Sequence, residues 1–282
     1  MTLTNTGAAI RARLLHRSKL DCVDFQFLLT RYGIERLLYR LSISPEKQHF
    51  LLKGALLFDL WYDVPLRPTR DIDLLGFGLA EFSHLITAFE SICAVKAEDG
   101  VLFDSHSIKA EEIRKDANYS GARLTLLGAL DHAKFKVQGD VGYGDAVTPA
   151  PEEGDFPTLI PGMPAPRLLV YPRYTVVAEK LEAIISFGMA NSRMKDYFDL
   201  WVILRDQELD TALLLSAINA TFKRRGTSKP RTLPVGLSEQ FAGDPQKLKQ
   251  WAAFVERNKL KAASLSEVVH ELRTTFTPFF VE

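Results

Sequence analysis

The sequence predicts an α+β protein in which a mixed sheet flanked by helices is followed by a C-terminal helical bundle lobe. Short segments before residue 143 alternate apolar and polar residues with the period of a strand. After residue 173, apolar residues recur instead at helical spacing. A segment with seven prolines, 149–172, separates the two patterns. We therefore expect an α/β domain with N-terminal helices over 1–165 and a helical domain over 166–282.

The expected elements of the first domain follow from local pattern and from glycine positions. In order, they are a helical stretch over 8–42 divided at Gly33, a strand over 50–60 that turns into a helix at Lys53-Gly54, a strand over 71–75, a helix over 82–93, and strand-like segments within 101–142. The proline-rich segment is expected to be an ordered connector without helix. The second domain is expected to hold helices over 174–188, 193–206, 209–222, 245–257 and 264–275.

Composition limits the classes of protein that the chain can belong to. Its 282 residues carry zero formal net charge, so any binding of nucleic acid must come from local basic patches. Cys22 and Cys93 fit neither a metal spacing nor a disulfide framework and are predicted to be buried thiols. No segment has transmembrane or signal-peptide character. We therefore expect a cytoplasmic protein without a membrane partner.

Two acids in the segment RPTRDIDLLGFG share one face of a predicted strand. Asp71 and Asp73 alternate with apolar residues, although Asp is disfavoured in strands. Side chains two residues apart on a strand lie roughly 6.5–7 Å apart, so both carboxylates can converge on Mg²⁺. The alternative is a solvated strand whose acids pair with Arg67 and Arg70.

A glycine turn precedes this strand. Gly54 permits backbone to approach a phosphate closely, and Lys53 beside it can donate to phosphate oxygens. The alternative is an ordinary turn between strand and helix. Together, the turn and the acid pair favour nucleotide chemistry supported by a divalent ion.

These residues resemble the signature of the nucleotidyltransferase superfamily: a Gly-containing turn, a helix, and a strand with two acids one residue apart. More narrowly, the chain is similar to the AbiEii/AbiGii toxin family in four blocks that occur in order. They are YGIERLLYRLSISPEKQHFLLKGALLFDLWYDVPLRPTRDIDLLGFG, KFKVQGDVGYGD, TVVAEKLEAII and RMKDYFDLWVI. At the turn, Ala55 stands where the superfamily usually has Gly or Ser.

The resemblance implies a nucleotidyltransferase-like fold and a set of site residues. The metal ligands for Mg²⁺ or Mn²⁺ would be Asp71, Asp73 and Asp140, with Asp145 as the second choice for the third acid. Lys180 and Asp196 would join these three in catalysis from a helical lobe that contributes to the active-site cleft. The NTP would contact Lys53, Gly54, Ala55, Thr69, Arg70, Lys195 and Asp199.

The helical segments themselves support roles for these residues. At about 100° per residue, Lys180 lies inside an apolar arc, roughly 40° from Ile184. A lysine there must extend its ammonium to solvent or meet an anion, and we favour the triphosphate. Asp196 and Asp199 lie one turn apart near a helix start, at the margin of a buried stripe, or else are surface acids favoured by the helix dipole.

The resemblance further implies the toxin of a bacterial toxin–antitoxin system, with a cognate antitoxin as partner. It implies transfer of NMP from NTP to RNA, with the 3′ end of tRNA as the expected acceptor. The basic segment 222–231 and the lysines Lys247, Lys249, Lys259 and Lys261 are a candidate RNA surface, or an ordinary solvated loop and helix face. Three alternatives stay open: a small-molecule acceptor such as an aminoglycoside, a kinase acting on the antitoxin, and a catalytically silent antitoxin-binding protein.

Overall fold

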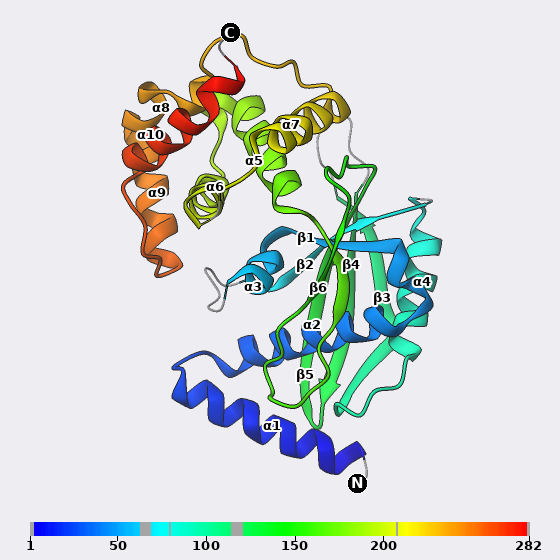
Figure 1. Ribbon diagram of the computed structural model, residues 1–282. Helices are drawn as coiled ribbons and strands as arrows, with labels where there is room; N and C mark the ends of the chain where they lie inside the picture. Colours follow the sequence, from blue (N-terminus) through cyan, green and yellow to red (C-terminus); the bar gives the residue numbers. More distant parts are fainter. Residues whose placement is uncertain (1–2, 63–68, 79, 114–120, 207, 281–282) are drawn as a thin grey trace. The chain divides into compact units, whose positions relative to one another are not determined.

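The computed structural model describes residues 3–62, 69–78, 80–113, 121–206 and 208–280 (Figure 1). The chain divides into two compact units. Unit 1 comprises residues 1–144 and 152–170, and unit 2 comprises residues 145–151 and 171–282. Arg67, the alternative partner of the acid pair, lies outside the described residues.

Two helices open unit 1. Helix α1 spans Leu3–Leu20 and α2 spans Phe25–Ile43, and the side chain of Asp24 caps α2 by accepting from the Phe27 N–H. The predicted division at Gly33 is wrong, because the break lies between the two helices and Gly33 is inside α2. A Cβ at Gly33 would lie 2.2 Å from the ring of Phe135, so this glycine lets the helix pack closely on the sheet.

The sheet of unit 1 is mixed and has seven strands among the described residues. Their bounds are Phe50–Lys53 (β1), Asp71–Gly76 (β2), Val101–Glu112 (β3), Gly121–Leu130 (β4), Ala133–Tyr143 (β5), Glu152–Asp155 (β6) and Arg167–Val170 (β7). Their order is β3-β4-β5-β2-β1-β7-β6, with β2 parallel to β5 and β1 parallel to β7 (Figure 1). The predicted α+β class with a mixed sheet is confirmed.

The two faces of this sheet differ in character. One face carries buried apolar residues such as Ile72 and Val137, and it packs against α2 and against α4, which spans Phe82–Ala94. Phe50 of β1 meets Phe89 of α4 edge-to-face at 5.6 Å between ring centroids. Since side chains alternate along a strand, the acids of β2 lie on the opposite face.

The proline-rich segment contributes two strands that the sequence did not predict. Pairing of β6 with β7 adds both to the sheet edge beside β1. Buried charged residues of α2 hold the loop between them: Glu35 accepts from the Leu159 N–H at 2.6 Å, and Arg36 donates to the Pro164 carbonyl at 3.0 Å. These strands escape sequence patterns because each has only four residues and because β7 pairs with β1, which is distant in the chain.

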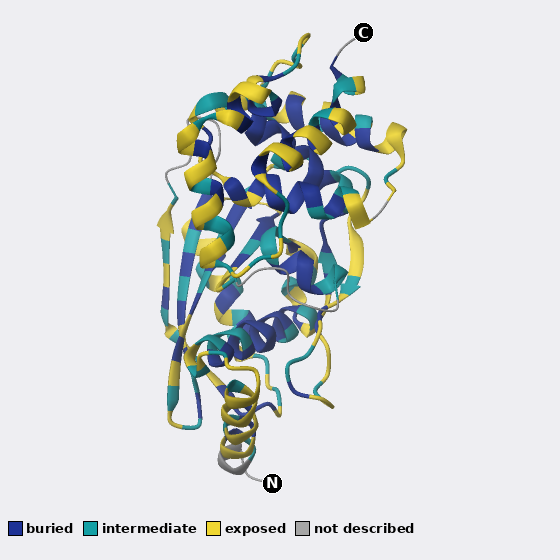
Figure 2. Ribbon diagram, turned by 90° about the vertical axis from the view of Figure 1, so that its left-hand side faces the viewer, coloured by how far each residue is buried: buried dark blue, intermediate teal, exposed yellow. Residues whose placement is uncertain are grey.

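Unit 2 is helical, as predicted. Its helices are α5 (Arg173–Phe187), α6 (Met194–Asp206), α7 (Thr211–Arg225), α8 (Glu239–Gly243), α9 (Pro245–Arg257) and α10 (Leu265–Phe276). Tyr197 stacks on Phe241 at 5.0 Å between ring centroids, and the Tyr197 hydroxyl donates to the Gly236 carbonyl. Figure 2 shows buried residues gathered on the inner faces of these helices.

Two further observations bear on the composition-based expectations. Cys22 is exposed and Cys93 is half-buried, so the prediction of two buried thiols is wrong for Cys22, which follows α1 in a turn with φ 51°. Burial raises the pKa of Cys93 to about 12. Among the described residues, none of the helices is long and apolar enough to cross a membrane.

Candidate active site

Four charged residues of unit 1 lie in one row across neighbouring strands. In the ladder registers, Lys53 of β1 opposes Asp73 of β2, Asp73 opposes Asp140 of β5, and Asp140 opposes Arg123 of β4. Residues that oppose each other in a sheet project from the same face, on strands about 4.8 Å apart. We call Lys53, Asp73, Asp140 and Arg123 the acid row.

The glycine turn packs directly on this row. Gly54 begins a short 3₁₀ turn, Gly54–Leu56, which leads into α3, Leu57–Trp61. A Cβ at Gly54 would lie 2.1 Å from Oδ2 of Asp73, and the residue has φ +73°, a left-handed conformation that favours glycine. Both constraints require glycine here, so the turn and the carboxylate form one compact group. Ala55, half-buried, follows on the same turn.

Asp140 is held by Arg123 through two hydrogen bonds. Nε of Arg123 donates to Oδ1 at 2.9 Å and its Nη2 donates to Oδ2 at 3.0 Å, while the two side chains are 37% and 17% exposed. The hydrogen bond to Asp140 raises the pKa of Arg123, and the charges of Asp140, Asp71 and Glu111 act in the same direction. The guanidinium therefore lies in the field of several acids.

The remaining predicted residues of unit 1 lie at the start of β2. Asp71 is exposed, opposes Gln138 of β5, and lies two residues from Asp73 on the same face of β2. Thr69 and Arg70 immediately precede β2, and the Arg70 guanidinium lies 5.6 Å from the centroid of the Phe27 ring.

The donor set of this face fits a hard divalent cation. Asp71, Asp73 and Asp140 offer carboxylate oxygens, which Mg²⁺ and Mn²⁺ prefer, and the absence of a side chain at Gly54 lets the Asp73 carboxylate pack against the turn. Within the residues that the structure describes, no three His, Cys, Asp or Glu side chains converge as a preformed metal cluster. Asp140 directs both oxygens to Arg123, so the three carboxylates are aligned by the sheet without being drawn to one point.

A second group of charges lies in unit 2. Lys180 of α5 donates to Oδ1 of Asp196 at 3.1 Å and to Oδ2 of Asp199 at 2.7 Å, and Arg193 donates to Oδ2 of Asp196. The two carboxylates are 0% and 1% exposed, so neither is a surface acid. We call Lys180, Arg193, Asp196 and Asp199 the charge cluster.

Electrostatics in this cluster favours ionised carboxylates. Burial alone would raise the pKa of Asp196, but the charges of Lys180 and Arg193 outweigh burial and lower the pKa to about 2. The exposed Lys195, which immediately precedes Asp196, lowers the pKa of Asp196 by a smaller amount. Lys180, which the sequence periodicity placed in an apolar arc, therefore forms ion pairs with the carboxylates of Asp196 and Asp199 in unit 2.

The turn before α6 is fixed from another helix. Lys247 of α9 is 5% exposed, donates to the Asn191 carbonyl at 2.9 Å and lies 5.4 Å from the Phe241 ring centroid. Lys247 is therefore not part of an exposed RNA surface. In the basic segment 222–231, Arg225 is likewise engaged with carboxylates, at 2.7 Å from Glu182.

Asp145, the second choice for the third acid, lies beyond the end of β5. Its side chain is 2% exposed and pairs with Arg225 at 3.8 Å, and the Tyr171 hydroxyl donates to its Oδ2 at 3.4 Å. Asp140 is the acid that shares a row with Asp73.

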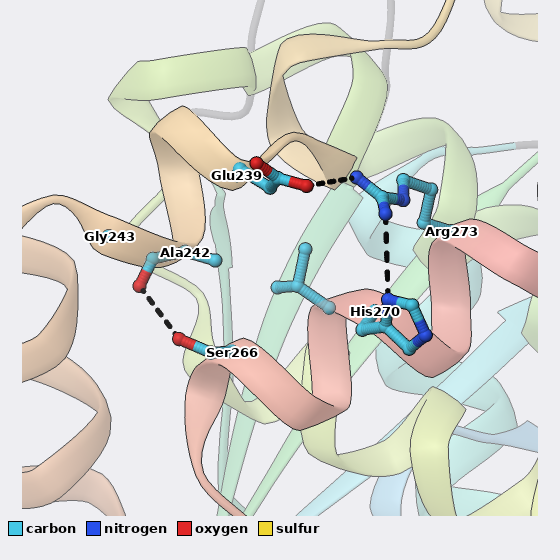
Figure 3. A pocket seen from close by; sticks show the side chains of 7 residues that line it. Glu239, Ala242, Gly243, Ser266, His270 and Arg273 are labelled. Carbon is cyan, nitrogen blue, oxygen red and sulfur yellow. Dashed lines mark hydrogen bonds and ion pairs between the residues drawn. The ribbon is translucent and has the colours of Figure 1, made fainter.

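Two pockets lie elsewhere in the units and contain none of the predicted site residues. The pocket of unit 1, about 490 Å³, has Phe77, His84 and Tyr143 in its lining. The pocket of unit 2, about 190 Å³, lies between α8 and α10, where Arg273 donates to Glu239 at 3.1 Å (Figure 3). Both the size and the internal pairing of this second pocket argue against an NTP site.

Arg123 is the residue of the row that sequence reasoning missed, although a signal for it exists. Asp131 and His132 form a two-residue turn between β4 and β5, with Asp131 at φ 53°. A two-residue hairpin turn sets the register of both strands, so it pairs Arg123 with Asp140.

A mixed sheet that aligns Asp73 and Asp140 on adjacent strands beside the Gly54 turn is the arrangement that the resemblance to nucleotidyltransferases implies. The comparisons agree: residues 36–272 match the family described as nucleotidyl transferase AbiEii toxin, type IV TA system. The chain belongs to this AbiEii family. It is therefore a nucleotidyltransferase toxin of a type IV toxin–antitoxin system, and the family implies an NTP substrate and an antitoxin partner.

Two solved structures from Helicobacter pylori are similar in fold. One is JHP933, with 16% identity, a TM-score of 0.50, and coverage of 91% of this chain and 93% of JHP933. The other is assigned provisionally as a nucleotidyltransferase, with 16% identity, a TM-score of 0.51, and coverage of 92% and 96%. No curated protein matches the chain.

Proposed function

We propose that this toxin transfers an NMP from an NTP to the 3′ end of tRNA and thereby blocks translation. The observation that carries the proposal is the acid row, in which Asp73 packs on the Gly54 turn and opposes Asp140. This arrangement supplies oxygen ligands and a close backbone approach on one face of one sheet. Both are what nucleotidyl transfer needs around a triphosphate.

Asp71, Asp73 and Asp140 would hold the divalent cation. When bound, Mg²⁺ or Mn²⁺ would supply charge stabilisation for the entering and leaving oxygens at the α-phosphorus. The chain's own contribution is to align the three carboxylates by strand register and to keep Asp73 fixed against Gly54. Asp140, which opposes Arg123 in the row, is the acid proposed to accept the proton of the acceptor hydroxyl.

Cationic groups would bind the phosphates. Lys53 of the acid row and Arg70, which immediately precedes β2, are the proposed cations of unit 1, and backbone N–H groups of the Gly54-Ala55 turn can donate to phosphate oxygens. Within unit 2, Lys180, Lys195, Asp196 and Asp199 are proposed to take part in the reaction, with Lys180 held by the two carboxylates.

A labelling reaction tests this function. The full chain is incubated with total tRNA, Mg²⁺ and each α-labelled NTP in turn, beside Asp73→Asn. The matched control is Asp155→Asn, an exposed acid on the edge strand β6 of the same sheet. We expect labelled tRNA with the wild type and with the control, and none with Asp73→Asn.

The outcomes separate the competing functions. Consumption of NTP with an aminoglycoside and no labelled RNA would select a small-molecule transferase. Label on the antitoxin from γ-labelled NTP would select a kinase. Equal inactivity and equal lack of toxicity of wild type and Asp73→Asn would select a silent binding protein.

A further inference from the structure

Arg123 occupies a position in unit 1 that the proposed chemistry does not explain. Its guanidinium takes both oxygens of Asp140, at 2.9 and 3.0 Å, from the neighbouring strand. A divalent cation at the acid row would draw on the same carboxylate. Two cations on one carboxylate repel each other, so Arg123 and a metal ion compete for Asp140.

A second acid faces Arg123 from the other side. In the β3–β4 register, Glu111 opposes Arg123, just as Asp140 does in the β4–β5 register. The exposed Glu111 also contributes to the raised pKa of Arg123. Directly opposed side chains on a sheet have Cβ atoms about 5 Å apart, within reach of an arginine. Arg123 therefore lies between two opposed carboxylates, Glu111 on β3 and Asp140 on β5.

We propose that Arg123 controls the entry of the divalent ion by alternating between Asp140 and Glu111. With Arg123 on Asp140, the third of the proposed metal ligands is engaged by the arginine. With Arg123 on Glu111, Asp140 joins Asp71 and Asp73 as a ligand. Arg123 is thus a positioning residue that sets the metal affinity of the row. This inference rests on the proposed function, because it requires the metal to bind at these acids.

A purely structural ion pair is the competing explanation. The Arg123 side chain is 37% exposed, and ion pairs with such exposure contribute little to stability. Variants of Arg123 should therefore fold, which allows their metal affinity to be compared directly. If the Arg123–Asp140 ion pair is only structural, substitution of Glu111 should not change the metal affinity through Arg123.

The test measures binding of Mn²⁺ alone to the full chain, from the spectroscopic signal of free Mn²⁺, without nucleotide or RNA. Arg123→Gln should bind Mn²⁺ about threefold or more tightly than wild type, and Arg123→Lys should fall between them. Glu111→Gln should weaken binding about twofold, because Arg123 then stays on Asp140. Glu112→Gln, the neighbouring exposed acid on the opposite side of β3, is the matched control and should bind as wild type.

The combination Arg123→Gln with Glu111→Gln gives the decisive comparison. If Glu111 acts through Arg123, the double variant binds Mn²⁺ as tightly as Arg123→Gln. An unchanged or weaker affinity of Arg123→Gln overturns the inference, as does an effect of Glu111→Gln that persists without the arginine. Absence of Mn²⁺ binding by every variant overturns it as well.

Asp73→Asn distinguishes this inference from the proposed function. If Asp73→Asn loses Mn²⁺ binding and Arg123→Gln binds Mn²⁺ with wild-type affinity, the proposed metal ligands are supported and the proposed role of Arg123 is wrong. Unchanged binding in Asp73→Asn together with tighter binding in Arg123→Gln contradicts the proposed metal ligands and retains competition at Asp140.

Discussion

The acid row of unit 1 and the charge cluster of unit 2 assemble similar side chains in different surroundings. In the row, Asp140 is 17% exposed and its partner Arg123 is 37% exposed. In the cluster, Asp196 and Asp199 are 0% and 1% exposed and share Lys180. Water can solvate the charged side chains of the acid row, whereas the buried carboxylates of the charge cluster are stabilised by their ion pairs within the cluster. We infer that the row can change partners at little cost to the fold, and that the cluster cannot.

The largest effect that this comparison predicts is the loss of NMP transfer when an acid of the row is substituted. Asp73→Asn should reduce NMP transfer on the order of a thousandfold, because it removes a charged ligand from the row. Its free energy of unfolding should stay within about 0.5 kcal/mol of wild type, since the side chain is only half-buried. Labelling of tRNA and urea unfolding measure the two quantities. A loss of stability as large as that of a cluster variant would break the comparison.

The cluster should respond in the opposite way. Asp196→Asn leaves the half-buried Lys180 with one carboxylate fewer, and breaking an ion pair to a buried carboxylate costs about 3 kcal/mol. Urea unfolding should show this decrease in the free energy of unfolding. Asp206→Asn, an exposed acid at the end of the same helix α6, should change it by no more than about 0.5 kcal/mol. Equal stability of the two variants would contradict the account.

The contribution of Asp196 to the stability of the fold should also depend on pH. The folded-state pKa of Asp196 is about 2, below the ordinary value of 3.8, so ionised Asp196 stabilises the fold above about pH 4. This contribution, about 2 kcal/mol, is lost as the pH falls through about 2. The stability difference between wild type and Asp196→Asn should therefore shrink on acidification between about pH 4 and about pH 2. Urea unfolding of both proteins across this range checks the sign, and a constant difference would contradict it.

The smallest predicted effect concerns Gly54, where backbone strain and the contact of an added Cβ with Asp73 can be distinguished by comparison with Gly78. Gly54→Ala should destabilise the fold by about 1–2 kcal/mol and also reduce transfer, because its Cβ displaces the Asp73 carboxylate. Gly78 has φ +96° and nothing within 4 Å of an added Cβ, so Gly78→Ala imposes comparable backbone strain without that contact. Assays of both variants should show reduced transfer only for Gly54→Ala. Equal activity of the two would remove the turn from the site.

The parts of the fold with strong local patterns could be predicted from the sequence. The strand of Asp71 and the helix of Lys180 follow from periodicity, and the mixed sheet with its helical lobe follows from the distribution of those patterns. The strands β6 and β7 could not be predicted, since a four-residue strand in a proline-rich segment is determined by its ladder partners.

The candidate site was predictable to a similar degree. Acids on one strand face are local information, but the alignment of Asp73 with Asp140 is a register between distant strands. The burial of Asp196 depends on how helices pack, which periodicity alone does not determine. Arg123 required the register of the β4–β5 hairpin, and that register is encoded in a turn of two residues.

The position of the transferred label tests the central claim most directly. Wild-type protein is incubated with tRNA, Mg²⁺ and an NTP that carries label either at the α- or at the γ-phosphate. We predict that α-label enters tRNA, that γ-label leaves in pyrophosphate, and that the two products form in equal amounts. Transfer of γ-label to any acceptor, with release of NDP, would contradict nucleotidyl transfer by the acid row.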